Sequence, residues 1–141
     1  MAGKIFVDIV SPNGSVFQGE ATGIRAPGTE GSFEVLYNHA PMLAAFDIGP
    51  IYVTVTDGSK IVFATSGGFL EVLDNRVTVL AETAEPASGI DVERAKESEK
   101  KALAALQAAS PEERTKAEVA LERARNRARV ALSSVGSKRS S

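Results

Sequence analysis

The stretch Thr83-Ala-Glu-Pro-Ala-Ser-Gly89 separates two parts of the chain that differ in composition and in apolar period. Proline, serine and glycine interrupt regular structure, so such a stretch is typical of a linker. All aromatic residues (six Phe and two Tyr) and ten of the twelve glycines precede it. Residues 1–88 carry a net charge of −6, and residues 89–141 carry +4. We therefore expect an aromatic-rich domain over residues 1–84, a linker over 85–89 and a separate basic segment from residue 90.

On the N-terminal side of the linker, apolar and polar residues alternate, which is typical of half-buried strands. The clearest hairpin is Asp57-Gly58-Ser59, which lies between alternating runs at 51–56 and 60–65. Other strand-like runs occupy 5–10, 16–17, 23–26, 32–36, 69–73 and 77–80, with turn residues at 11–14, 27–28, 67–68 and 74–75. Short strands at this spacing predict an antiparallel β-sandwich or barrel over residues 1–84.

On the C-terminal side, the apolar period becomes that of a helix. One face of a first helix carries Val92, Ala95, Glu99, Ala102, Leu103 and Leu106. A second helix carries a heptad-like seam made of Ala117, Leu121, Ala124, Ala128 and Ala131. The pattern predicts an antiparallel two-helix hairpin over residues 90–132.

The end of the first helix and the start of the second are set by Ser110-Pro-Glu-Glu113. Ser110 is expected to be the N-cap, Pro111 the first helical residue, and Glu113 the acidic member of a capping box. The last residues, 133–141, are rich in serine and are expected to be a disordered tail.

Composition excludes several classes of function. The chain has 141 residues, no cysteine and one histidine, His39, which rules out disulfides, thiolate sites and zinc sites made of several histidines. No apolar run reaches the length of a membrane span, and no signal or transit peptide is evident at the N-terminus. Because the net charge is only −2, general nucleic-acid binding is not expected. These features favour a soluble intracellular protein.

Three segments carry a resemblance to a known family. They are Ser66-Gly-Gly-Phe-Leu-Glu-Val72, the following Asn75-Arg-Val-Thr-Val-Leu-Ala-Glu-Thr-Ala84, and Gly31-Ser-Phe-Glu-Val-Leu-Tyr-Asn-His-Ala-Pro41. Together with the order of the two parts, they resemble the epsilon subunits of bacterial F-type ATP synthases. Asn38 stands where the family usually has a glycine before the histidine, and Glu34 replaces a second glycine. The resemblance extends to about residue 132.

The resemblance implies a rotor component without a catalytic site of its own. The sandwich would contact the gamma subunit and the ring of membrane c subunits, and would couple ion-driven rotation to ATP synthesis. The helical hairpin would extend into the alpha/beta catalytic hexamer and inhibit ATP hydrolysis. The chain would then lie at the cytoplasmic face of a bacterial cell membrane, attached only through the complex, and would require no cofactor other than a possible regulatory ATP.

For the gamma subunit and the c ring, the resemblance implies contact residues in loops of the sandwich. These are Ser11, Gly28, Glu30, Gly31, Ser32, His39, Pro41 and Met42. Taken without the family, the same residues are also consistent with a polar turn, a proline bend and a turn histidine bonded to the backbone. Both interpretations remain open at the level of sequence.

For ATP, the resemblance points to the motif Ile90-Asp-Val-Glu-Arg-Ala95. In nucleotide-binding relatives the corresponding residues here would be Glu85, Ile90, Asp91, Arg94, Ala95, Arg123 and Arg127. Three arginines suit phosphate oxygens because the guanidinium group is planar and permanently charged. The same side chains are also consistent with a helix N-cap at Asp91 and a solvated basic face.

The alanine seam is compatible with a hairpin that changes partners, although without the resemblance the residues favour a single state. A buried methyl group contributes roughly 0.8 kcal/mol, against about 1.5–3 kcal/mol for a leucine-sized side chain. Alanine is also the best helix former, so each helix needs little support from its neighbour. The alternative is an alanine-rich pair of helices with a single state. At the level of the whole protein, the alternative is a free-standing ATP-binding sensor or a ligand-binding β-sandwich module.

Overall fold

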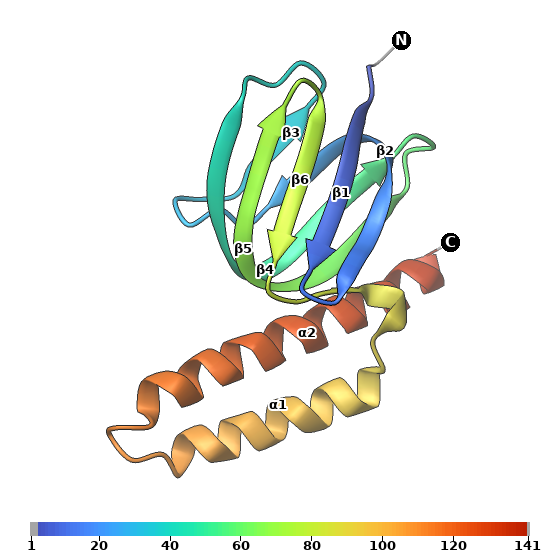
Figure 1. The fold of residues 1–141 in the computed structure, drawn as a ribbon. Coiled ribbons are helices and arrows are strands. Elements are labelled where there is room, and N and C mark those ends of the chain that lie inside the picture. Colours follow the sequence, from blue (N-terminus) through green and yellow to red (C-terminus); the bar gives the residue numbers. More distant parts are fainter. Residues whose placement is uncertain (1–2, 141) are drawn as a thin grey trace. The chain divides into compact units, whose positions relative to one another are not determined.

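A computed structural model describes residues 3–140 of the chain, with side chains described for residues 3–133 (Figure 1). The chain divides into two compact units, Met1–Pro86 and Ala87–Ser141. The boundary therefore falls inside the expected linker at 85–89. The first unit is built of strands and the second of helices, and each is described below by itself.

The first unit is a strongly curved sheet (Figure 1). In chain order its strands are β1 (Ile5–Ser11), β2 (Gly14–Ala26), β3 (Phe33–Leu36), β4 (Met42–Val55), β5 (Lys60–Leu73), β6 (Arg76–Ala81) and β7 (Ala84–Pro86). Neighbours follow the order β1-β6-β5-β4-β2-β3, with β7 beside β5. An additional β1–β2 pairing joins both sides of the sheet, and only the β1–β6 pair is parallel among the described strands. The predicted β-sandwich is confirmed.

Strands β4 and β5 are long enough to take part in both layers of the sandwich. They pair from Met42 with Val72 to Thr54 with Lys60, with an interruption at Asp47 and Gly67, and Asp57-Gly58-Ser59 makes the predicted hairpin turn between them. The prediction of a turn at 67–68 was wrong, because these two glycines lie inside β5. Gly67 and Gly68 have positive φ angles of 97° and 156°, and at Gly68 a side chain would collide with the carbonyl oxygen of Leu80. The two glycines let β5 bend while it stays paired with β6.

The core of the sandwich is formed by inward-facing residues of the alternating runs. Every second residue of β1 is buried, at Ile5, Val7 and Ile9. The rings of Phe17 and Phe63 meet edge to face, with centroids 5.7 Å apart. The largest fully buried side chains are Phe63, Ile5, Ile9, Ile24, Ile51, Leu70, Val7, Val35, Val53, Val72, Val77 and Val79. This aromatic and aliphatic core supplies the main hydrophobic stabilisation of the first unit.

The second unit is the predicted antiparallel hairpin of helices. It consists of a short 3-10 helix, η1 (Ala87–Gly89), followed by α1 (Val92–Gln107) and α2 (Arg114–Ser140). Helices α1 and α2 pack on each other, and η1 packs against α2. Of the predicted α2 seam, Leu121, Ala128 and Ala131 are buried and Ala117 and Ala124 half-buried, and Asn126 and Val130 outside the seam are buried as well. Within α1, only Ala95 is buried, so the shared core of the hairpin is small.

The predicted start of the second helix needs a correction. Helix α2 begins at Arg114 rather than at Pro111. The backbone N–H and the hydroxyl of Ser110 both donate to the carboxylate of Glu113, at 3.1 and 3.0 Å, which closes a separate turn before the helix. These bonds, the backbone one first, lower the pKa of Glu113. The carbonyl of Glu113 then accepts the first helical bond from Ala117, so Ser110 is not the N-cap.

The end of α2 also differs from expectation. The helix continues to Ser140, whereas the sequence predicted a disordered tail over residues 133–141, of which residue 141 lies outside the described part. No proline follows Pro111, and the Ser133 hydroxyl donates to the carbonyl of Val130 at 2.6 Å. Serine can therefore be accommodated in a helix by bonding back to the preceding turn. Among the described residues, no helix is both long and apolar enough to cross a membrane.

Candidate functional site

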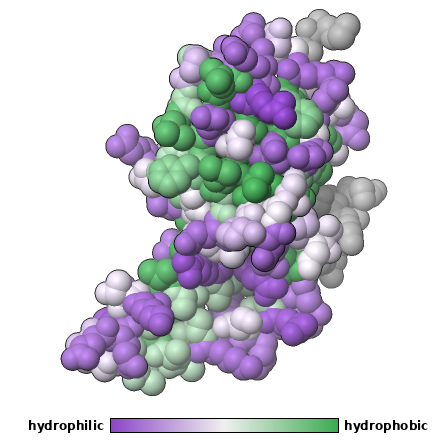
Figure 2. All heavy atoms as spheres, viewed as in Figure 1, coloured by the Kyte–Doolittle hydropathy of each residue, from purple (hydrophilic) through white to green (hydrophobic). Residues whose placement is uncertain are grey.

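One outer face of the sandwich exposes several large apolar side chains, with Glu71 and Thr78 beside them (Figure 2). Ala45 of β4 lies opposite Phe69 of β5, Phe69 lies opposite Leu80 of β6, and Leu80 lies opposite Val10 of β1. These pairs form one apolar row across the strands, and Leu43 and Leu73 lie on the same side. We call this surface the apolar face and define it as Val10, Leu43, Ala45, Phe69, Leu73 and Leu80.

Exposure distinguishes the apolar face from an ordinary surface. Leu43 is 71% exposed, Phe69 55% and Leu80 54%. A contiguous patch of large apolar side chains on a soluble surface typically marks a site of protein contact. At its edge, the guanidinium group of Arg76 lies 4.6 Å from the centre of the Phe6 ring, so a charged rim borders the apolar centre. This arrangement is typical of protein interfaces.

The predicted contact loop at residues 28–32 forms a compact exposed turn. The N–H of Gly31 donates to the carbonyl of Gly28 at 3.0 Å, and Gly31 has a φ of 126° that favours glycine. Glu30 and Ser32 are exposed on this turn, where the Ser32 hydroxyl accepts a bond from Nε of Arg25 at 3.0 Å. The loop is thus held in one shape by its backbone, with its polar side chains available to a partner.

The His39 turn is attached to the sandwich through its neighbour. The N–H of His39 donates to the carbonyl of Leu36, and its Nδ1 bonds the carbonyl of Ala40 at 2.7 Å. The preceding residue, Asn38, bonds to Asn75 in the β5–β6 turn. His39 is half-buried and Pro41 is exposed. These contacts support the interpretation of a turn histidine bonded to the backbone.

The remaining two predicted contact residues are less prominent on the surface. Ser11 ends β1, and its hydroxyl lies 3.4 Å from the carbonyl oxygen of Gly14. Met42 packs against the sandwich core, whereas its neighbour Leu43 is exposed. Because side chains alternate along a strand, Leu43 rather than Met42 presents its apolar surface to a partner.

In the helical unit, the predicted nucleotide motif forms the start of α1. Asp91 is the N-cap, and its carboxylate accepts a bond from the N–H of Arg94 at 3.0 Å. Ile90 and Ala95 are buried, and Arg94 is exposed. The capping role predicted as the alternative is therefore present. This cap uses the backbone N–H of Arg94, so the guanidinium group of Arg94 is not engaged by it and stays exposed.

The register of the hairpin decides which arginines of α2 lie near this motif. Arg125 Nε lies 3.6 Å from a carboxylate oxygen of Glu99, so these positions face each other. With a rise of about 1.5 Å per residue, Arg129 then lies nearest to the level of Arg94, and Arg127 lies about one turn from Arg94 along the axis. Arg123 lies roughly 10 Å from Arg94 by the same rise. Only an elongated anion such as a triphosphate can reach all three arginines.

Three of the predicted nucleotide residues already have interactions within the chain, namely Glu85, Arg123 and Arg127. Glu85 lies in β7 of the first unit, opposite Ala64 of β5. A nucleotide would therefore exchange some existing contacts for new ones. Among the described residues, no cluster of His, Asp or Glu is arranged to hold a metal ion.

The sequence analysis missed the apolar face, although the sequence contains a signal for it. Phe69 and Leu70 are both apolar and adjacent in β5, as are Val79 and Leu80 in β6. Adjacent residues of a strand point to opposite sides, so one of each pair must leave the core. Leu70 and Val79 are buried, while Phe69 and Leu80 are the exposed members.

Comparison with known families matches both units of the chain. A family model described as the beta-sandwich domain of the ATP synthase delta/epsilon chain matches residues 4–87. A second model, described as the long alpha-helix domain of the same chain, matches residues 88–131. Together these two matches cover most of the sequence.

Individual relatives agree with the family models. A protein named ATP synthase epsilon chain from Salinibacter ruber is 57% identical over 115 residues, which cover 76% of this chain and 77% of the relative. One from Desulfitobacterium hafniense is 43% identical, over 88% of this chain and 93% of the relative. A chain of the Euglena gracilis mitochondrial ATP synthase, solved as an OSCP/F1/c-ring structure, has a TM-score of 0.75 at 26% identity, covering 84% of this chain and 76% of that one.

Proposed function

The chain belongs to the delta/epsilon chain family of ATP synthases and is an epsilon subunit of an F-type enzyme, and we propose from this premise that it is a non-catalytic part of the central stalk. In this role the sandwich binds the gamma subunit and the c ring and couples ion-driven rotation to ATP synthesis. The chain then lies at the cytoplasmic face of the membrane through the complex alone, and no cofactor is required for coupling.

The observation that carries the proposal is the apolar face. Its row from Ala45 through Phe69 and Leu80 to Val10 lies on paired strands and thus forms a rigid surface. Transmission of torque requires such a surface, because a flexible loop would yield under load. We assign the apolar face to the gamma subunit and the exposed turn at 28–32, which includes Glu30, to the c ring.

Association with gamma tests this assignment. Replacing Phe69→Ser and Leu80→Ser together is expected to weaken binding of the full chain to gamma by at least about tenfold, because central apolar anchors dominate interface energy. Leu36→Ser is the matched control, since Leu36 is 51% exposed but lies outside the apolar face. Equal loss of binding in both variants, or none in the double variant, would contradict the assignment.

The helical hairpin acts as the regulatory arm in this proposal. It inhibits ATP hydrolysis when it leaves its folded arrangement and enters the alpha/beta catalytic hexamer. The small alanine-rich seam supports this role, because only Ala95 is buried in α1 and little apolar burial is lost when the helices separate. A ligand that prefers the folded hairpin would shift the population toward it.

We propose ATP as that ligand, held within the helical unit by the Arg94, Arg123 and Arg127 guanidinium groups, with Asp91 as an acceptor. Its support is the short axial distance of about one turn between Arg94 and Arg127, although Arg129 on the other flank lies nearer still to the level of Arg94. The exposed Arg94 side chain at the start of α1 leaves an approach for phosphate. The alternative, a free-standing sensor, lacks a reason for the exposed apolar face.

A further inference from the structure

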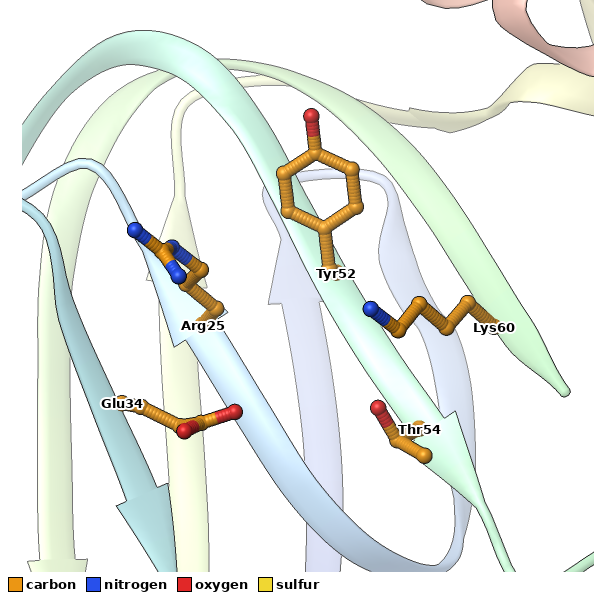
Figure 3. A pocket seen from close by; sticks show the side chains of 5 residues that line it. All are labelled: Arg25, Glu34, Tyr52, Thr54 and Lys60. Carbon is orange, nitrogen blue, oxygen red and sulfur yellow. The ribbon is translucent and has the colours of Figure 1, made fainter. Parts of the chain in front are cut away.

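A pocket lies on the other outer face of the sandwich, away from the apolar face (Figure 3). It has a volume of about 360 Å³ and is lined by Arg25, Glu34, Tyr52, Thr54 and Lys60. Pockets of a few hundred Å³ suit small ligands. None of the residues discussed so far as partner or nucleotide contacts lines it, so it requires its own explanation.

The register of the sheet builds this pocket from two adjacent rows of side chains. Glu34, Arg25 and Tyr52 lie opposite one another on β3, β2 and β4. Thr54 lies opposite Lys60 in the neighbouring row. That second row continues across β2 to Gly23.

Gly23 helps to keep the space open. It lies opposite both Thr54 and Leu36. A Cβ at Gly23 would come within 2.9 Å of Leu36 Cδ2 and 3.9 Å of Glu34 Oε2. A larger residue would therefore intrude beside the pocket, where glycine leaves room.

The charge of the pocket is unusual for this domain. Residues 1–88 contain only four basic side chains against ten acidic ones. Lys4 pairs with Glu20 at 3.3 Å, and Arg76 stacks over Phe6. The other two basic residues, Arg25 and Lys60, both line the pocket, and within the part of the chain whose side chains are described neither forms an ion pair.

Arg25, Glu34, Thr54 and Lys60 border a common space, whereas the Tyr52 hydroxyl points away from it. In Figure 3 the guanidinium group of Arg25 and the ammonium group of Lys60 approach from opposite sides, and the Thr54 hydroxyl and the Glu34 carboxylate border the same opening. Arg25 uses its Nε to bond Ser32, which holds the guanidinium group in place and leaves its terminal nitrogens for a ligand. Donors on several sides suit a tetrahedral oxyanion better than a planar carboxylate.

We propose that this pocket binds hydrogen phosphate as the inorganic ion. Arg25 and Lys60 neutralise the charge, Thr54 donates a hydroxyl hydrogen bond, and the base of the Tyr52 ring borders the opening. The Glu34 carboxylate can only accept, so it selects a ligand that carries a proton. Hydrogen phosphate has such a P–OH group near neutral pH, whereas sulfate has none. The assignment does not depend on the regulatory role of the hairpin.

Titration of the full chain with sodium phosphate, followed by amide resonances at constant ionic strength, tests the proposal. The chain carries Arg123→Ala and Arg127→Ala in every arm, so that the helical arginines do not contribute. We expect saturable shifts at the amides of residues 23–25, 52–54 and 60, and binding to sulfate weaker by about tenfold or more. Unsaturable shifts, shifts spread over the surface, or equal binding of sulfate would overturn the proposal.

Variants distinguish the pocket from general charge. Arg25→Gln with Lys60→Gln should weaken phosphate binding by at least about tenfold. Lys4→Gln with Arg76→Gln removes the same charge outside the pocket and should leave affinity within about twofold. Equal loss in both pairs would overturn the proposal.

Two further arms test the carboxylate and the source of the phosphate. Glu34→Gln should abolish the preference for phosphate over sulfate, because Gln can also donate to an unprotonated oxygen; an unchanged preference would count against the role of Glu34. If the chain binds phosphatidylglycerol vesicles but not inorganic phosphate, Arg25 and Lys60 bind a lipid headgroup instead. That result would overturn the proposal.

Discussion

Asn38 and Asn75 hydrogen-bond to each other across two turns that are 37 residues apart in sequence. The N–H of Asn38 donates to Asn75 Oδ1 at 2.6 Å, and Asn75 Nδ2 donates to Asn38 Oδ1 at 3.2 Å. Both residues have positive φ angles, 64° and 63°, which asparagine tolerates better than most residues. Asparagine at position 38 thus adopts the left-handed backbone that a glycine would allow, and adds a bond that attaches the His39 turn to the sheet.

Asn75→Gly is expected to destabilise the sandwich by about 1 kcal/mol, because both reciprocal bonds are lost while glycine still accepts the positive φ. Urea unfolding followed by tyrosine fluorescence measures the change. Asp74→Gly is the matched control, since Asp74 lies in the same turn with a φ of 50°. Equal destabilisation in both variants would show that the asparagine pair contributes nothing specific.

Mg-ATP is expected to bind the full chain saturably in calorimetry, and Arg123→Ala with Arg127→Ala should abolish binding, because the phosphates lose two guanidinium partners. The control is Arg125→Ala with Arg129→Ala, which removes the same charge from the other flank of α2, where Arg125 contacts Glu99. If both pairs behave alike, the arginines act as a diffuse basic face. Absence of binding by the unmodified chain would remove the sensor role and leave the stalk role intact.

Leu121→Ala should destabilise the hairpin by about 2–3 kcal/mol, because Leu121 is the one buried leucine of the α2 seam. Amide exchange in α1 and α2 measures the change. Leu103→Ala serves as control, because Leu103 is 38% exposed and its loss leaves a smaller cavity. If the seam holds the hairpin, Leu121→Ala speeds amide exchange in both helices and Leu103→Ala hardly changes it. Equal amide protection in the two variants would contradict this account of the hairpin's stability.

In the turn between the helices, the pKa of the Glu113 carboxyl should be lower than that of an ordinary glutamate. Ser110 bonds to the ionised Glu113 and lowers the pKa of its carboxyl below the usual value near 4.5. Ionised Glu113 therefore stabilises the turn above the unfolded-state pKa, and this contribution is lost as the pH falls below that value through the folded-state pKa.

Carboxyl resonances followed against pH test this directly. In Ser110→Ala, the pKa of Glu113 should rise only part of the way, because the backbone N–H of residue 110 still donates. The pKa of Asp57, which is lowered by bonds from the Ser59 side chain and backbone, should stay unchanged. A Glu113 pKa that does not move would show that the hydroxyl has no influence.

Much of the fold could be predicted from local pattern. Alternation in β1 and the Asp57-Gly58-Ser59 turn identified the sandwich, and the spacing from Ala117 to Ala131 identified the helical seam. The turn at 67–68 was mispredicted because glycine pairs serve both turns and bends. Only the pairing of β5 with β6 shows that Gly67 and Gly68 form a bend. The early start expected for α2 failed because the N–H of Glu113 bonds the carbonyl of Ser110 in a three-residue turn, and the first helical bond runs from Ala117 to Glu113.

The candidate sites were predictable to different degrees. Asp91 at the start of α1 follows from local sequence, because an N-cap depends on neighbours three residues away. The apolar face and the phosphate pocket depend on strand order. Val10 meets Leu80, and Arg25 meets both Glu34 and Tyr52, only through long-range register. A single sequence carries no direct signal for such pairings.

The most direct test of the central claim compares the full chain with a chain that ends at residue 88, each assembled with the partner subunits of the ATPase. The full chain is expected to lower the rate of ATP hydrolysis. The shortened chain should bind with equal affinity through the intact apolar face but leave hydrolysis uninhibited. If both chains bind and hydrolysis is the same with either, the helical hairpin is not a regulatory arm and the central claim fails.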